Sequence, residues 1–291
     1  MKAALLAGSH YMHAVGLEPL PSLEGALRAA CREHHRRVDR FIQLALLGAA
    51  RCVDGRKLDA DCSLYLGSGI GPEGNNIVVQ EQICRDRLFP RPFNFVNTLG
   101  SSATFYVAKD LGLDSQAWWV SRRGASLEAV LELALADMEL GLCSQALVGV
   151  VEECPFPYEE HRRRVQAASH AVLAEGSHWV LLGARSAPDT ASITAAFNLG
   201  AQDLVDELRV AWGEGDRLAL GPGIPAALAG CLAAAVDVPL PTSENGFPSH
   251  DSLAAARLTG WFQTRAEGRL HLLCGVPESY ARLELAAWGG A

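Results

Sequence analysis

The sequence predicts an α/β fold with a large buried core. Apolar segments typical of buried strands alternate with helical segments along all 291 residues. Apolar residues make up 49% of the chain and charged residues 20%, a composition that indicates a folded core rather than disorder. The segment 118–153, WWVSRRGASLEAVLELALADMELGLCSQALVGVVEE, has the pattern of a buried strand, a sharp turn, a long apolar helix and a second buried strand. Such strands around an enclosed helix favour a mostly parallel sheet that is covered on both faces.

Apolar runs and turn residues predict the elements of the first half. The expected segments are a strand at 3–8, helices from about 23 into the basic cluster REHHRRVDR and at 38–51, and a strand in 61–71 that ends in a glycine-rich turn. The prolines Pro90 and Pro92 favour an extended segment over 90–100. Ser101 or Ser102 is the expected cap of a following helix, and Gly112 is expected to end it.

The next helix is predicted over 125–140, with Gly141 ending it. Ala, Leu, Val and Met cover most of this helix, so only a narrow acidic stripe of Glu128, Glu132 and Glu139 is expected to be exposed. The alternation then repeats more weakly, which predicts two similar α/β halves. The remaining expected elements are strands at 145–151, 178–184, 217–223, 269–276 and 281–288 and helices at 225–236 and 252–266, with a polar excursion at 154–164.

Charge and cysteine content narrow the possible function classes. The net charge of −8 argues against a broad nucleic-acid footprint, although HRRRVQ (161–166) is a local basic cluster. The eight cysteines form no C-x-x-C pair and no spacing typical of zinc. We therefore expect reduced, buried thiols in a cytoplasmic protein without a bound metal or cofactor. The N-terminus lacks the pattern of a signal peptide, and no apolar run is long enough to cross a bilayer.

Several segments together resemble a known enzyme family. They are VDRFIQLALLGAA, SLYLGSGIGPEG, PFNFVNTLGSSATFYVAKDLGL, the segment 118–153 and AEGSHWVLLGARSA, followed more loosely by LALGPGIP, TSENGFPSHDSLAAARLTGWF and HLLCGVPESYARLEL. In this order they resemble a β-ketoacyl-acyl-carrier-protein synthase, closely to about Ala184 and loosely beyond it. The resemblance implies the thiolase fold, with sheets packed around buried helices. It implies one compact unit made of an N-terminal half, 1–184, and a shortened C-terminal half, 185–291.

The residues that the family uses for condensation are replaced in this chain. The reaction requires a thiolate at a helix N-terminus, where the helix dipole lowers the thiol pKa, together with two imidazoles. The resemblance places the nucleophile at Arg123, or at Gly124 with a shift of one residue. The other replaced positions are Leu220 and Phe247 for the two histidines, Thr242 near the family lysine, and Cys274 for a gating phenylalanine; His250 is three residues out of register.

The chain keeps the segments of the family's architecture but lacks its catalytic residues. In this it resembles a chain length factor, the inactive subunit that pairs with an active ketosynthase in type II polyketide and fatty-acid systems. Subunits of aryl-polyene pathways are the nearest resemblance. The implied partners are an active ketosynthase, in a heterodimer, and an acyl carrier protein. The resemblance places Trp118, Trp119 and Val120 on the partner interface, with ordinary core tryptophans as the alternative. It places Phe105 and Tyr106 on the acyl tunnel, with core packing as the alternative.

Other interpretations of single residues stay open. Arg122 and Arg123 could reach the partner, neutralise Glu152 and Glu153, bind an anion at the helix N-terminus or lie in a solvated turn. Ser121 and Ser126 are poor nucleophile candidates because no G-x-S-x-G motif or base accompanies them. His34, His35 and the HRRR run could form a basic surface that attracts acidic carrier proteins. At the level of function, the alternatives are an acyl-processing enzyme that uses Cys274 or His250, or a scaffold subunit without a tunnel role.

Overall fold

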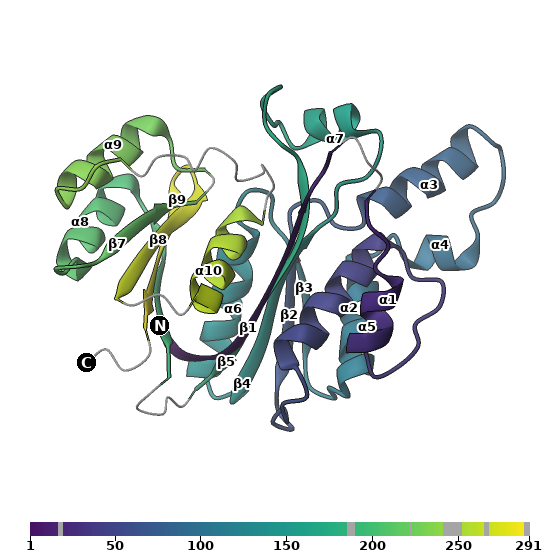
Figure 1. Cartoon of the computed structure of the whole chain (residues 1–291), viewed down its shortest axis with the longest axis horizontal. Coiled ribbons are helices and arrows are strands. Elements are labelled where there is room, and N and C mark those ends of the chain that lie inside the picture. The colour runs from purple at the N-terminus through teal and green to yellow at the C-terminus, as the bar shows by residue number, and fades with distance from the viewer. Residues whose placement is uncertain (17–19, 185–189, 222, 241–251, 265–267, 288–291) are drawn as a thin grey trace.

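A computed structural model describes residues 1–16, 20–184, 190–221, 223–240, 252–264 and 268–287 (Figure 1). The strands are β1 (Lys2–Ala14), β2 (Ser63–Ser68), β3 (Ala117–Ser121), β4 (Gln145–Glu152), β5 (Ala174–Gly183), β6 (Ser192–Leu199), β7 (Arg217–Leu220), β8 (Arg269–Val276) and β9 (Ser279–Ala286). The helices are α1 (Glu24–Ala30), α2 (Arg40–Val53), α3 (Glu73–Cys84), α4 (Pro92–Val96), α5 (Gly100–Leu111), α6 (Ser126–Glu139), α7 (Tyr158–Arg164), α8 (Ala201–Ala211), α9 (Ala226–Ala235) and α10 (Leu253–Thr264).

The strands form a sheet in the order β3-β2-β4-β5-β1-β6-β9-β8-β7. Its two parts repeat one topology, because β7-β8-β9-β6 has the order of β2-β4-β5-β1 and lacks only a counterpart of the edge strand β3 among the described residues. In each part the first strand pairs antiparallel with the last, β1 with β5 and β6 with β9. The predicted pair of similar halves with a truncated second half is therefore confirmed. A boundary between 184 and 185 stays a prediction, because residues 185–189 lie outside the described chain.

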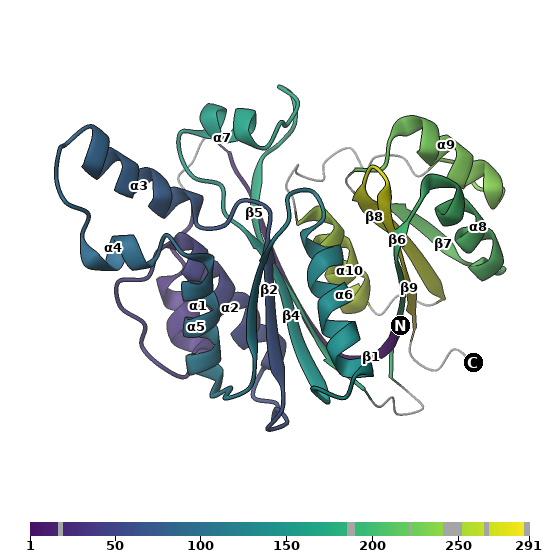
Figure 2. The same ribbon diagram turned by 180° about the vertical axis from the view of Figure 1, so that it is seen from behind.

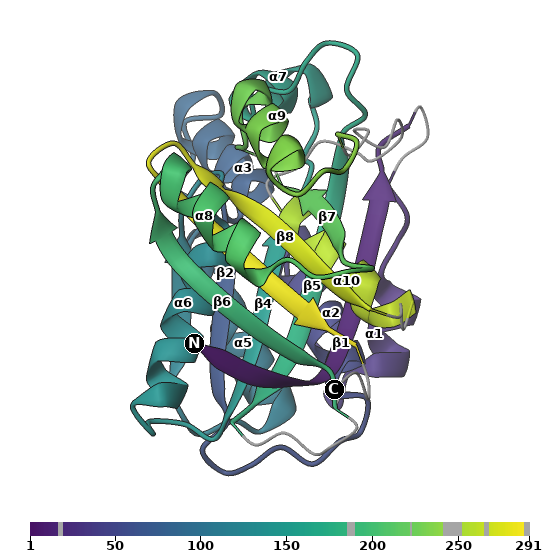
Figure 3. The same ribbon diagram turned by 90° about the vertical axis from the view of Figure 1, so that its left-hand side faces the viewer.

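The halves are joined by β1 and by a shared helical layer. The start of β1 pairs with β6 through Lys2 to Ala4, and the rest of β1 pairs with β5. Helices α6 and α10 lie between the two parts of the sheet, α1, α2 and α5 cover the outer face of the first part, and α8 and α9 cover the second (Figures 1, 2 and 3). The buried helices predicted from the sequence are thus α6 and α10, which share one core with residues of β4, β5, β8 and β9.

Trp179 explains two glycines of the first half. Its indole is fully buried on β5 between α2 and β4. A Cβ atom on Gly48 of α2 would lie 2.4 Å from an indole carbon, and one on Gly149 of β4 would lie 2.3 Å from another. Contacts this short do not occur between packed carbon atoms, so the helix and the strand reach the ring only because both positions are glycine.

Some helix ends follow local sequence signals, although the expected serine cap of α5 is absent, because α5 begins at Gly100 with Leu99 as its N-cap. Asp39 caps α2 by accepting a hydrogen bond from the backbone N–H of Ile42, at 3.0 Å. Gly112 ends α5 at a φ of 69°, as predicted, because only a residue without Cβ adopts this left-handed conformation at little cost. Gly141, at a φ of 71°, follows the end of α6 in the same way.

Several expectations were wrong. The extended segment predicted over 90–100 contains α4, because a proline in the first turn of a helix loses no hydrogen bond there. The sheet is mixed rather than mostly parallel: only β2 with β3, β2 with β4 and β7 with β8 run parallel. A strand buried on both faces has the same apolar pattern in either direction, so the sequence could not separate the two cases.

In the described part of the chain, no helix is long and apolar enough to span a bilayer.

Candidate functional site

The turn between β3 and α6 keeps the sharp geometry expected of a nucleophile turn. Gly124 has a φ of 74°, and helix α6 starts two residues later at Ser126. The Ser126 hydroxyl donates to the carbonyl of Arg122 at 2.7 Å, which closes the turn and occupies that hydroxyl. At the two aligned positions the chain carries Arg123, which is exposed, and Gly124. Neither side chain can be acylated, so the turn offers no nucleophile at the aligned positions.

Two of the replaced positions, Gly124 and Leu220, lie close to the end of β8, which carries a third, Cys274. Gly124 approaches the end of β8, where an added Cβ would lie 3.3 Å from Cγ1 of Val276. Leu220 ends β7, and an added Cβ on the next residue, Gly221, would lie 2.6 Å from Cβ of Cys274. The fold therefore brings Gly124, Leu220 and Cys274 into one region, and that region is tightly packed. Thr242, Phe247 and His250 lie outside the described residues.

Glu128 and Cys274 form a buried pair behind the turn. Glu128 was expected to be exposed, but it lies in the first turn of α6 beside Cys274 of β8, and only 5% of it is accessible. Burial is the main cause that raises the pKa of Glu128. A hydrogen bond with the Cys274 thiol lowers this pKa by a smaller amount. Burial and the neighbouring Glu128 raise the pKa of Cys274 well above its ordinary value. Because the thiolate is the reactive form of cysteine, Cys274 is a poor nucleophile, and this weighs against an enzyme that uses it.

Arg122 bridges the two halves of the chain. Its guanidinium donates to the Ser279 hydroxyl of β9 at 3.1 Å, and Ser279 donates to Asn198 of β6 at 3.2 Å. The turn is thereby tied to the second half. The acids considered as partners for this arginine have bonds of their own: Ser68 donates to Glu152 at 2.9 Å, and the backbone of Gly74 donates to Glu153 at 2.7 Å.

Strand β3 is an edge of the sheet, and its side chains alternate between the faces. It pairs with β2 on one side, and no described strand pairs with its other side. Trp119 points to the outer layer, where its ring centroid lies 5.7 Å from that of Phe41 in an edge-on arrangement. The indole packs directly against the backbone of Gly100, where a Cβ atom would overlap it. Val120 packs against the central core. Trp118 remains 45% exposed, which leaves an indole on an unpaired strand edge.

Many exposed apolar side chains lie on elements close to this strand in sequence. Helices α3 and α4 form an arm that extends from the first half, and α5 links this arm to β3 (Figures 1 and 2). We call the exposed apolar residues of these elements the apolar surface: Val78, Ile83, Leu88, Phe89, Phe93, Phe95, Val96, Leu99, Phe105 and Trp118. Contiguous exposed apolar patches mark protein-binding surfaces, so these side chains are the candidates for such a patch.

The two predicted tunnel residues have different surroundings. Phe105 is 61% exposed and belongs to the apolar surface. Tyr106 packs against the outer core of the first half and meets the His35 ring edge-on at 5.9 Å. The ring centroids of Phe105 and Tyr106 lie 5.6 Å apart, so the two rings contact each other.

Buried carboxylates anchor the arm. Glu73, in the first turn of α3, is paired with His161 at 2.7 Å and with Arg164 of α7. Burial raises the pKa of Glu153 to about 8, and burial raises that of Asp39 to about 6. His161 and Arg164 of the HRRR run thus hold α3 through Glu73, rather than forming a free basic surface. The glycine-rich turn after β2 is also held by a buried acid, because the backbone N–H of Gly69 donates to Glu152.

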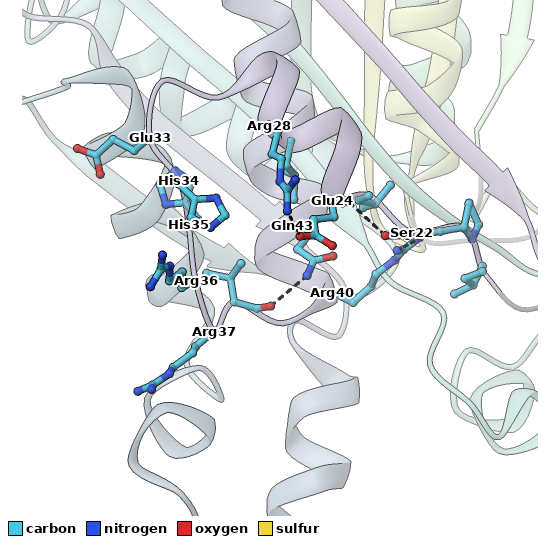
Figure 4. Close-up of a pocket in the computed structure, with 15 residues that line it drawn as sticks. Ser22, Glu24, Arg28, Glu33, His34, His35, Arg36, Arg37, Arg40 and Gln43 are labelled. Atoms are coloured by element: carbon cyan, nitrogen blue, oxygen red, sulfur yellow. Dashed lines mark hydrogen bonds and ion pairs between the residues drawn. The ribbon is translucent and has the colours of Figure 1, made fainter.

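A basic pocket lies between α1, the loop 31–39 and the start of α2 (Figure 4). The cavity has a volume of about 530 Å³. Its charged lining is mainly cationic, and Figure 4 shows the residues that supply it: Arg28, His34, His35, Arg36, Arg37 and Arg40, with Glu24 and Glu33. Arg40 is held by an ion pair with the buried Glu175. Residues of the basic segment REHHRRVDR thus line a pocket that suits an anionic ligand or partner.

No family model matches the sequence, and no curated protein matches it. Solved structures match over most of the chain. The ishigamide ketosynthase/chain length factor has a TM-score of 0.66 and 18% identity, covering 86% of this chain and 81% of that one. The AntDE:AntF structure, a type II PKS acyl-carrier protein in complex with its ketosynthase, has a TM-score of 0.63 and 13% identity, covering 86% and 84%.

A third match is the ketosynthase ApeO in complex with its chain length factor ApeC from Xenorhabdus doucetiae, with a TM-score of 0.53 and 10% identity over 96% and 98% of the two chains. OleA of Xanthomonas campestris also matches, with a TM-score of 0.59 and 13% identity over 98% of each chain. Identities this low identify the fold alone. The chain has the thiolase-like fold that ketosynthases and chain length factors share.

Proposed function

We propose that this protein is a non-condensing, ketosynthase-like subunit that pairs with an active ketosynthase, as a chain length factor does. One observation carries the proposal: the turn before α6 keeps its sharp geometry, while its aligned positions are Arg123 and Gly124 and the space behind it is filled by Glu128 and Cys274. A condensing enzyme requires an ionised thiol at this turn. The architecture thus fits a subunit whose role is binding rather than bond formation.

The structural matches support this assignment. Two of them are described as a ketosynthase together with a chain length factor, and a third as a ketosynthase with its acyl-carrier protein. By the same likeness we place the chain in type II polyketide or fatty-acid-type synthesis, with an aryl-polyene system as the nearest candidate. Free cysteines at all eight positions agree with a reducing location, and we propose the cytoplasm.

The apolar surface and the β3 edge are the proposed partner interface. An unpaired strand edge with an exposed indole promotes association, and aromatic residues are enriched at interfaces. Trp118 would contact the partner directly, whereas Trp119 would hold the strand against α5. The basic pocket is the proposed contact for an acyl carrier protein, because acidic carriers are attracted to clustered arginines.

A condensation assay with the Cys274→Ser variant tests the proposal. The purified chain alone should release no condensed product from carrier-bound substrates, and its complex with the ketosynthase encoded nearest to it should be active. Cys274→Ser should leave the activity of the complex within about twofold, because this thiol is buried and protonated and makes no covalent intermediate. Condensation by the chain alone, or loss of activity in the variant while the complex stays intact, would overturn the proposal.

Phe105 gives a test of tunnel function against a pure scaffold. If its ring forms part of the tunnel wall at the interface, Phe105→Ala should lengthen the products of the complex, because the smaller side chain removes the bulk that stops chain growth. Val210→Ala on α8 is the control, since Val210 is also exposed and lies on the second half. Mass spectrometry of the released products measures the change. Unchanged product length in Phe105→Ala would favour a scaffold role.

A further inference from the structure

Three side chains with metal-binding atoms meet beside the basic pocket. Cys31 is the C-cap of α1, His35 lies in the loop that follows, and Asp110 lies near the end of α5. One ligand atom from each lies within 4.8 Å of the other two. The sequence separation hides this group, because Asp110 is 75 residues from His35.

The two most buried members are held in place. The side chains of His35 and Asp110 are only 5% and 1% exposed, and Nε2 of His35 lies 2.9 Å from Oδ1 of Asp110. The backbone N–H of Glu33 donates to the same oxygen at 3.0 Å. Arg32 fixes the loop to the same end of α5 by donating to the carbonyl of Leu111 at 2.7 Å. The loop and the helix therefore hold the three ligand atoms near one point.

The donor set suits a borderline divalent cation. Thiolate, imidazole and carboxylate are the three ligand types of protein zinc sites, and Cys31 and His35 lie four residues apart, at the start of one loop. A buried carboxylate needs a cationic partner or a metal, and the ion-pair partner described for Asp110 is the His35 imidazole. His35 also lines the basic pocket, so the group lies beside that pocket (Figure 4).

We propose that Cys31, His35 and Asp110 bind one Zn²⁺ ion, with water in the fourth position. The ion would replace the direct contact between His35 and Asp110 as the connection between the loop and α5. It would also fix the loop that carries Arg36 and Arg37 of the basic pocket. Its part in the fold would be to hold the loop to α5, with the water as the exchangeable ligand.

Metal titration of the full chain, after removal of metals with a chelator, tests this site. Native mass spectrometry should detect one tightly held Zn²⁺ per chain, and Co²⁺ should produce the near-ultraviolet absorption of a thiolate–cobalt bond. Cys31→Ser should abolish that absorption and weaken Zn²⁺ binding by at least about tenfold, because it removes a direct ligand. Zn²⁺ should raise the melting temperature of the wild type but not of the variant.

Cys84→Ser is the matched control, because Cys84 is a free, exposed thiol at the end of α3. It should keep wild-type Zn²⁺ affinity and the cobalt absorption. Asp110→Asn provides a second ligand variant and should also weaken binding, with circular dichroism confirming that each variant is folded. A wild-type chain that holds no Zn²⁺, or a folded Cys31→Ser variant with wild-type affinity, would overturn the proposal.

Discussion

Trp118→Asp should separate this subunit from its ketosynthase. The variant places a carboxylate on the unpaired edge of β3, where the proposed interface would bury it without a partner. We expect the complex to weaken by at least about 30-fold, since a central aromatic residue at an interface contributes about 2 kcal/mol or more. The side chain is 45% exposed in the single chain, so the variant itself should fold normally. Isothermal titration calorimetry or analytical ultracentrifugation measures the loss.

Val210→Asp is the control for this experiment. Val210 is 89% exposed on α8, on the second half of the chain and away from β3, so the same change there should leave the affinity unaltered. An intact complex with Trp118→Asp would place the interface elsewhere. Equal weakening by Val210→Asp would indicate that added charge, rather than the position, is responsible.

Leu131→Ala should produce a large loss of stability. Leu131 is fully buried in the core that α6 and α10 share between the two halves. Removal of its side chain leaves a cavity there, and we expect the free energy of unfolding to fall by about 2–5 kcal/mol. Urea denaturation at a fixed protein concentration measures the change, with the midpoint shifting and the slope unchanged.

Leu140→Ala is the matched control for Leu131→Ala. Leu140 follows the end of the same helix and is 74% exposed, so this change should alter the free energy of unfolding by no more than about 0.5 kcal/mol. A similar effect of the two changes would mean that α6 is not enclosed between the halves, contrary to the fold described above.

Local signals were sufficient to predict much of the fold. Gly112 and Gly141 end their helices as expected, because a left-handed residue after a helix is specified by a single glycine. The strand, turn and helix around Gly124 were also predicted, since the apolar pattern changes period there. Strand β6 and helix α8 were missed. Their segment, SITAAFNLGAQDLVDELRVA, mixes small and charged residues, and the contrast that identifies a buried strand is weak.

Contacts between distant residues limited what could be predicted about the sites. Glu128 fits a helical stripe with Glu132 and Glu139, but in the folded chain it is buried beside Cys274, which is 146 residues away in sequence. The direction of β5 depends on its neighbours in the sheet rather than on its own residues. The group of Cys31, His35 and Asp110 forms because α5 packs beside α2, a contact that no local pattern contains.

Acyl loading of the copurified complex tests the central claim most directly. The chain would be coexpressed with the ketosynthase encoded nearest to it, purified through a tag on one subunit, exposed to an acyl thioester and weighed by native mass spectrometry. Our account predicts a one-to-one complex with a single acyl group, located on the partner. A stable homodimer that ignores the ketosynthase, or an acyl group on this chain, would contradict it.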